Sequence, residues 1–175
     1  MRKISSNRIS GLRGRRVSGN GLDPYMDAHK KEGVSVCTTC RAVHERGKWR
    51  WTDAPKDSQP MVCPACRRVE DHCPAHLLRI DGVPQEQQHE LVAMIHHAAD
   101  EEARLHPIER LMWLREDKER IEVALTGAHI ARRLRAAIAR SWRGSFASKL
   151  GVEHTELRWK PESKRGGKHA EPTDS

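Results

Sequence analysis

The pattern of hydrophobic and polar positions is most regular from residue 76 to residue 160. Strict alternation is clearest at Ile121, Val123 and Leu125, whose neighbours are polar or small. Such alternation is typical of a strand with one buried face. A short apolar run ending at a glycine predicts another strand at 76–81. Two further strands are predicted, at 110–115 and 155–160.

Two segments between these strands have helical periodicity. In the first, Leu91, Ile95 and Ala98 recur at the spacing of one helix face. Proline is tolerated in the first turn of a helix and ends one elsewhere, so this helix is predicted from Pro84 to about residue 105, before Pro107. The second helix is predicted at 128–142, with an apolar face formed by Ile130, Leu134, Ala137 and Ile138.

The predicted order is therefore strand, helix, strand, strand, helix, strand. This order is the split βαβ, or ferredoxin-like, plan. Right-handed crossovers would place both helices on one face of a four-stranded antiparallel sheet. The segment between the second helix and the last strand contains glycine and serine and is predicted to be a loop.

Four of the five cysteines form two Cys-x-x-Cys pairs, Cys37 with Cys40 and Cys63 with Cys66. Zn²⁺ takes four such thiolates in tetrahedral geometry, and the closed shell leaves no position for a substrate. A strand-like run between the pairs suits a β-ribbon, so the segment predicts a zinc ribbon with a knuckle at each pair. A rubredoxin-like iron site has similar spacing, and a redox dithiol is a third interpretation.

Cys73 is the remaining cysteine, and His76 follows it closely. Together they could begin a second metal site, but the other histidines are scattered along the chain. We interpret Cys73 as a thiol without a metal-binding role where the ribbon meets the sheet. A redox sensor that uses Cys73 is the alternative.

The chain is thus predicted to be an α+β protein in four parts. A flexible basic arm at 1–33, with eight basic and three acidic residues, precedes a zinc ribbon at 34–75. A ferredoxin-like βαββαβ domain, an α/β sandwich, follows at 76–160. The polar tail at 161–175 is expected to be disordered.

The formal net charge of +8 over 175 residues favours an acidic partner: nucleic acid, the ribosome or an anionic membrane surface. No apolar run is long enough to cross a membrane. The basic N-terminus lacks the apolar segment of a secretory signal. A cytoplasmic location is therefore expected, and cysteine thiols stay reduced there. In that compartment paired cysteines indicate metal ligands and not disulfides.

Three groups of basic residues are candidates for nucleic-acid contacts: one in the arm at 1–33, one between the two cysteine pairs and one in the second predicted helix. The second predicted helix has five arginines and no acidic residue, although pairing with the acidic first helix is an alternative explanation. Trp49 and Trp51 alternate with basic residues and could stack on bases, but covering the junction of ribbon and sheet is the favoured interpretation. The candidate contacts are Arg13, Arg15, Arg16, Lys48, Arg50, Arg132, Arg133, Arg135, Arg140 and Arg143.

No catalytic set is visible in the sequence. A phosphate-binding glycine loop, a nucleophile elbow and a paired set of acids in a cleft are all missing from the pattern. The thiols that could act as nucleophiles are more simply metal ligands. The sequence therefore predicts a protein that is not an enzyme.

The cysteine pairs, the segment Arg67 to Asp71 and the segment His106 to Met112 resemble a bacterial zinc-ribbon family. That family is described as similar to the nonsense-mediated-decay-type export adaptor of the large ribosomal subunit. The resemblance covers about residues 35–160 and implies four cysteine zinc ligands and a ribosomal or rRNA partner. The adaptor has further cysteine pairs and domains, so what carries over is large-subunit binding in assembly, quality control or stress. A DNA-binding or transcription-associated zinc-ribbon regulator is the alternative.

Overall fold

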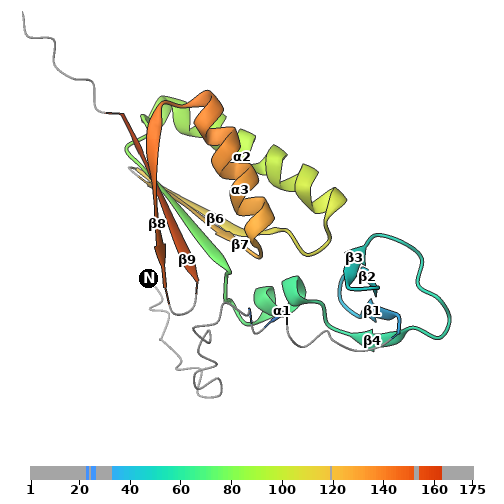
Figure 1. Ribbon diagram of the computed structural model, residues 1–175. Helices are drawn as coiled ribbons and strands as arrows, with labels where there is room; N and C mark the ends of the chain where they lie inside the picture. Colours follow the sequence, from blue (N-terminus) through green and yellow to red (C-terminus); the bar gives the residue numbers. More distant parts are fainter. Residues whose placement is uncertain (1–22, 24, 27–32, 119, 152–153, 163–175) are drawn as a thin grey trace, which may run out of the picture.

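The computed structural model describes residues 23, 25–26, 33–118, 120–151 and 154–162. Within these residues the protein is a mixed α+β structure with three helices and two sheets (Figure 1). The cysteine-containing segment forms the smaller sheet. The larger sheet and its two long helices follow in sequence, and the short helix α1 (Pro64–Glu70) lies between the two parts.

The smaller sheet has the strand order β3-β2-β1-β4. Each of its strands is three residues long: β1 (Ser35–Cys37), β2 (Val43–Glu45), β3 (Lys48–Arg50) and β4 (Gln59–Met61). Its buried cluster consists of Cys37, Ala42, Trp49, Cys63, Ala65 and Cys66. Burial alone stabilises such a small core only weakly, and half of its residues are cysteines. The segment therefore needs a further stabilising element such as a bound metal ion.

The larger sheet has the order β6-β7-β5-β9-β8. Its strands are β5 (His76–Asp81), β6 (Leu111–Asp117), β7 (Arg120–Leu125), β8 (Gly144–Leu150) and β9 (Thr155–Pro161). β5 pairs antiparallel with β7 and parallel with β9. Helices α2 (Gln85–Leu105) and α3 (Ala128–Ser141) pack together over one face of this sheet (Figure 1).

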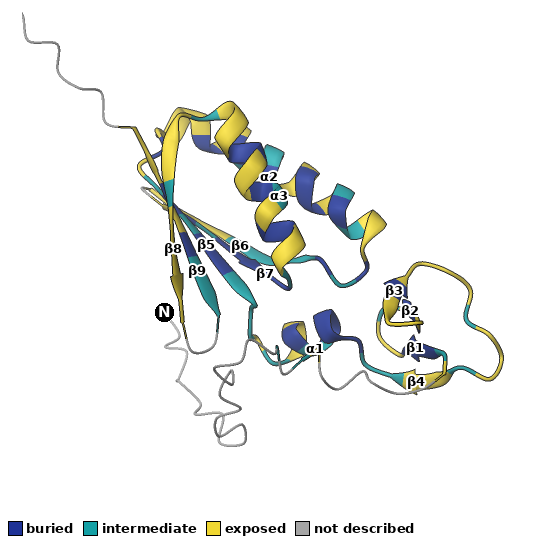
Figure 2. Ribbon diagram, viewed as in Figure 1, coloured by how far each residue is buried: buried dark blue, intermediate teal, exposed yellow. Residues whose placement is uncertain are grey.

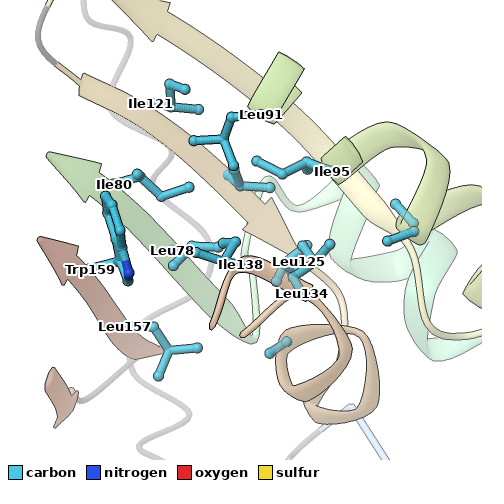
Figure 3. Packing of buried hydrophobic residues seen from close by; sticks show 14 of the residues in the cluster. Leu78, Ile80, Leu91, Ile95, Ile121, Leu125, Leu134, Ile138, Leu157 and Trp159 are labelled. Atoms are coloured by element: carbon cyan, nitrogen blue, oxygen red, sulfur yellow. The ribbon is translucent and has the colours of Figure 1, made fainter. Parts of the chain in front are cut away.

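The main core lies between the larger sheet and the two helices. Figure 2 shows the buried stripes of α2 and α3 beside their exposed outer faces. Leu78 and Ile80 of β5 point into the core with Trp159 of β9 and Ile138 of α3 (Figure 3). The alternation read from the sequence at 121–125 is therefore the alternation between this core and the opposite face of the sheet.

The larger sheet has five strands where the sequence predicted four. β8 replaces the predicted loop and pairs with β9 along its whole length, from Gly144 with Pro161 to Leu150 with Thr155. Most residues of β8 are exposed, so it lacks the apolar alternation that marks a strand. Because β8 runs antiparallel to β9, it reverses the direction of the chain once more before β9. β9 therefore runs parallel to β5, and the sheet is not fully antiparallel as predicted.

The other predicted elements agree closely with those observed. The strand at 76–81 has the predicted bounds, and α3 ends one residue before the predicted end. Pro84 is the residue before α2 instead of its first residue, which removes no hydrogen bond from the helix. The helix α1 was not predicted, because its seven residues contain too few apolar positions to show a period.

Two described residues of the predicted arm contact α1. Asp23 forms an ion pair of 2.6 Å with Arg68, which is only 4% exposed. The ring of Tyr25 lies over the same guanidinium, and its hydroxyl donates to Asp71 at 2.9 Å. The rest of the predicted arm, apart from Met26 and Gly33, and the tail from residue 163 lie outside the described residues. Among the described helices, none is long and apolar enough to cross a membrane.

His76, the first residue of β5, makes the stability of this fold depend on pH. Its Nδ1 is buried without a hydrogen-bond partner among the described residues. Burial, followed by the charge of Arg68, lowers the pKa of His76 below its ordinary value of 6.5. Below pH 6.5, His76 is protonated in the unfolded chain before it is protonated in the folded chain. The folded state therefore loses stability as the pH falls through 6.5.

We expect the urea concentration at the unfolding midpoint of the larger domain to decrease when the pH is lowered from about 7.5 to about 5.5. The decrease should be smaller in His76→Gln. Glutamine cannot take up a proton, so only this one contribution is removed. The measurement is urea unfolding of both proteins at several pH values, with the difference between them as the result. Parallel pH curves would contradict the assignment, since contributions shared by both proteins cancel.

Candidate functional site

The structure brings the four predicted cysteines together. Their Sγ atoms all lie within 4.8 Å of one another, and those of Cys40 and Cys63 are 3.7 Å apart. A tetrahedral metal–thiolate shell with bonds of about 2.3 Å requires sulfur–sulfur distances of about 3.8 Å. Three of the four cysteines are buried, and Cys40 is half-buried. The group could therefore hold one metal ion with little rearrangement.

The first pair lies in the turn between β1 and β2. Cys37 ends β1, and its Sγ accepts from the backbone N–H of Cys40 at 3.5 Å. Arg41, directly after the turn, has a φ of 69°, the left-handed conformation that lets the chain reverse closely. This geometry agrees with the knuckle predicted for the first pair.

The second pair lies at the start of a helix and not in the predicted second knuckle. Cys63 is the N-cap residue of α1, and its Sγ accepts from the backbone N–H of Cys66 at 3.4 Å. Pro64 occupies the first helical position, where its missing N–H removes no bond. A knuckle and the first turn of a helix both leave two residues between the cysteines. The spacing in the sequence therefore does not distinguish the two geometries.

Burial, backbone N–H groups and neighbouring sulfurs shift the pKa values of the thiols in this group. Burial would raise the pKa of Cys37, but backbone N–H groups of Cys40 and Cys63 outweigh it and lower the pKa to about 6. Burial and the neighbouring sulfurs raise the pKa values of Cys63 and Cys66. Four adjacent thiolates therefore cannot form together without a positive charge among them.

Arg110 supplies one positive charge from outside the ribbon. Its Nη2 donates to the Sγ of Cys40 at 3.0 Å, and its two terminal nitrogens lie 3.6 and 3.9 Å from the sulfurs of Cys66 and Cys63. Burial alone would lower the pKa of Arg110, but these three sulfurs raise it. The sequence predicts Arg110 at the start of a strand, and no local signal connects it with cysteines up to 70 residues away.

Cys73 does not join the four cysteines. It is half-buried beside α1, and its carbonyl accepts from Arg68 at 3.1 Å. Within the described residues, the only cluster with metal-binding geometry consists of the other four cysteines. This placement agrees with the interpretation of Cys73 as a thiol outside the metal site.

The two tryptophans of the ribbon have different environments. Trp49 is buried in the small core, between the exposed side chains of Lys48 and Arg50. Trp51 is 46% exposed, and its Nε1 donates to the carbonyl of Ala103 in α2 at 2.8 Å. Trp51 therefore lies at the junction with the larger domain, which is the interpretation that the sequence favoured.

The five candidate arginines near α3 divide into two groups. Arg133 pairs with Glu101 at 2.5 Å and with Glu102 at 3.4 Å, so the acidic helix α2 neutralises it. The other four are exposed and have no carboxylate within ion-pair distance in the described part of the chain: Arg132, Arg135, Arg140 and Arg143. Arg135 lies over the ring of Phe146 in β8, at 5.2 Å from its centre.

The face of the larger sheet opposite the helices carries paired charges. Arg79 lies between Glu122 and Glu156 at 2.9 and 2.7 Å, and Arg120 pairs with Asp81 at 2.7 Å. Because these guanidinium groups are already paired with carboxylates, they are less available to bind phosphates. The remaining candidate contacts, Arg13, Arg15 and Arg16, lie outside the described residues.

The four cysteines form a group that could hold one metal ion, with the guanidinium of Arg110 beside it. Four thiolates around one ion leave no open coordination position. Comparison with family models, with curated proteins and with solved structures finds no match for this chain.

Proposed function

We propose that this protein is a non-enzymatic, zinc-dependent RNA-binding factor whose partner is the large ribosomal subunit or its RNA. The observation that carries the proposal is a group of exposed arginines without a carboxylate partner among the described residues, three on α3 and one just before β8: Arg132, Arg135, Arg140 and Arg143. We call this the α3 arginine surface. Guanidinium groups free of carboxylates are available to phosphate oxygens, which they bind in a bidentate way.

Zinc is the ion that best suits the four cysteines. The donor set is entirely thiolate, and the 3.7 Å separation of Cys40 and Cys63 suits the short bonds of a tetrahedral zinc site. Bound zinc would supply folding free energy to a segment whose own core is very small. The side chains of this site hold a shape and take no part in bond making.

We interpret the larger domain as a variant of the ferredoxin-like plan. The order β6-β7-β5-β9 with α2 and α3 on one face follows that plan, and β8 is an addition at the edge. The added strand reverses the direction of the chain before β9, which accounts for the parallel pair. An RNA-recognition sheet of the usual kind stacks bases on its open face, but here ion pairs cover that face. We therefore assign RNA contact to the α3 arginine surface.

Two further features support this assignment. Arg135 stacked on Phe146 presents a planar cation on a rigid base, an arrangement that suits stacking with bases as well as phosphate contact. Lys48 and Arg50 are exposed on β3 and form a second, smaller cationic site on the ribbon. A protein that contacts the ribosome at two such sites would gain affinity from both.

The triple variant Arg135→Gln, Arg140→Gln, Arg143→Gln should bind ribosomal RNA more weakly and with a lower salt dependence. Each lost phosphate contact reduces the slope of log K against log salt by roughly 0.7–0.9. The measurement is fluorescence anisotropy with an rRNA fragment at several salt concentrations. The control is Arg79→Gln, Arg120→Gln, Arg158→Gln, which removes the same charge from paired positions and should retain most of the binding.

Sedimentation of tagged protein through a gradient tests the partner. We expect co-migration with the large subunit at low salt and partial release at moderate salt. Protein that stays at the top of the gradient under both conditions would contradict the ribosome proposal. Cross-linking in cells separates the alternative, since recovery of promoter DNA instead of rRNA would point to a DNA-binding regulator.

A further inference from the structure

We propose that the metal centre also joins the two parts of this protein, because Arg110 of the larger domain binds the thiolates of the ribbon. Loss of the metal would then release the ribbon from the larger domain as well as unfold it. The inference rests on the metal ion of the proposed function and not on its RNA partner.

The contact of Arg110 with the sulfurs is made by a guanidinium that approaches three of the four at once. Its Nη2 is 3.0 Å from the Sγ of Cys40 and 3.9 Å from that of Cys63, and its Nη1 is 3.6 Å from that of Cys66. The planar group therefore faces the centre of the cluster and not a single ligand. It supplies the outer hydrogen bonds that orient metal ligands and adjust their basicity.

Arg110 is held firmly on its own side of the junction. Its backbone N–H donates to the Oγ1 of Thr126 at 2.7 Å, and its carbonyl accepts from the N–H of Thr126 at 3.0 Å. Its Nε donates to the carbonyl of Pro107. Because Thr126 directly follows β7, the position of the guanidinium is fixed by the larger sheet. The hydrogen bonds of Arg110 thus connect the sulfurs of the ribbon to the larger sheet.

The other contacts between the ribbon and the larger domain are smaller. Trp51 donates one hydrogen bond to Ala103, and its ring lies 5.6 Å from the guanidinium of Arg110. Ile108 packs against the small cysteine cluster. The hydrogen bond of Trp51 is exposed to water, where such bonds add little net stability. Arg110 contacts the metal ligands themselves, so we expect its contact to depend on the metal more directly than the other two do.

The charges explain this dependence on the metal. A divalent ion with four thiolates carries a net charge of −2, which attracts the guanidinium. When the ion leaves, nothing holds the four sulfurs at one point, and the partly buried Arg110 loses the three sulfurs that it contacts. A partly buried cation without a counter-charge is unfavourable, so undocking restores its hydration.

The test is ¹⁵N relaxation of the full chain with zinc bound, in wild type and in Arg110→Gln. In wild type we expect the same tumbling time for amides of the ribbon and of the larger sheet. In Arg110→Gln the ribbon should tumble as a smaller body while it still holds its metal, with a zinc affinity reduced 10- to 100-fold in chelator competition. Arg110→Lys retains the charge but not the planar fork, and it should lie between the two.

Arg115→Gln is the matched control, because Arg115 is exposed on β6, lies over the ring of Trp113 in its own strand and donates to no sulfur in the described contacts. It should retain the tumbling and the zinc affinity of wild type. An Arg110→Gln protein that binds zinc and tumbles as one body would overturn this inference alone. A wild-type chain that binds no metal would refute the metal of the proposed function together with the inference. If Arg110→Gln does not fold, Arg110→Lys decides the matter, since unchanged tumbling and affinity there would overturn the inference.

Discussion

Cys63→Ser should abolish stoichiometric metal binding and unfold the ribbon while the larger domain remains folded. The Sγ of Cys63 is buried, lies 3.7 Å from that of Cys40 and accepts the capping hydrogen bond of α1. A serine hydroxyl is a poor ligand for zinc, and its shorter bond would not reach the same position. Structural zinc contributes roughly 10–16 kcal/mol of apparent binding free energy, which is folding free energy for such a segment.

Metal analysis of gel-filtered protein and a ¹H–¹⁵N spectrum measure this result together. We expect the amides of residues 34–72 to move to random-coil positions and those of β5 to β9 to stay in place. The two parts should separate because the core of the larger domain lies between its own sheet and helices and contains none of the four cysteines.

Cys73→Ser is the matched control for this experiment. Cys73 lies outside the cluster of four sulfurs, so the variant should keep one metal ion per chain and the wild-type spectrum of the ribbon. Full metal content in Cys63→Ser would contradict the assigned site. A lost response to oxidant in Cys73→Ser would favour a redox role for that thiol.

Trp159→Ala should lower the free energy of unfolding of the larger domain by about 3–5 kcal/mol. The side chain is 1% exposed and lies in β9, opposite Ile80 on one neighbouring strand and Phe146 on the other. The backbone of β8 also packs on the indole, since a Cβ at Gly144 would lie 2.5 Å from the ring. Alanine would leave a large cavity in the core beside Ile80 (Figure 3).

Trp159→Phe should cost less than half as much. The Nε1 of Trp159 is buried and has no hydrogen-bond partner among the described residues. A buried donor without a partner costs about 1–3 kcal/mol, and phenylalanine removes that cost while it fills most of the space. The measurement is urea unfolding followed by far-ultraviolet circular dichroism, with the metal kept in excess.

Trp51→Ala is the control in this series, because Trp51 is largely outside the core of the larger domain. It should change the free energy of unfolding of that domain by less than about 1 kcal/mol. Equal costs for Trp159→Phe and Trp159→Ala would contradict the account of an unpaired indole N–H.

Elements that bury one face were readable from the sequence. Ile121, Val123 and Leu125 alternate because every second residue of β7 enters the core, and Leu91 and Ile95 repeat because α2 covers that core. β8 could not be found in this way. As an exposed edge strand it is held by pairing with β9, and pairing with a distant segment leaves no period in the local sequence.

The candidate site shows the same division. The spacing of the two cysteine pairs predicted their cluster, because a Cys-x-x-Cys pair brings its two sulfurs together both in a tight turn and in the first turn of a helix. Arg133 and Arg135 look equivalent in the sequence, but one pairs with the acids of α2 and the other stacks on Phe146. Which arginines remain available to a partner depends on how the two helices pack.

The sequence by itself therefore determined the mixed α+β class, the principal strands and helices, and the four cysteines that come together. These features follow from local spacing and from the period of burial. Only the tertiary structure decided the five-stranded order, the neutralisation of Arg133 and the approach of Arg110 to the thiolates. Each of these depends on contacts between distant segments, and no local pattern records them because their free energy is gained only when the chain has folded.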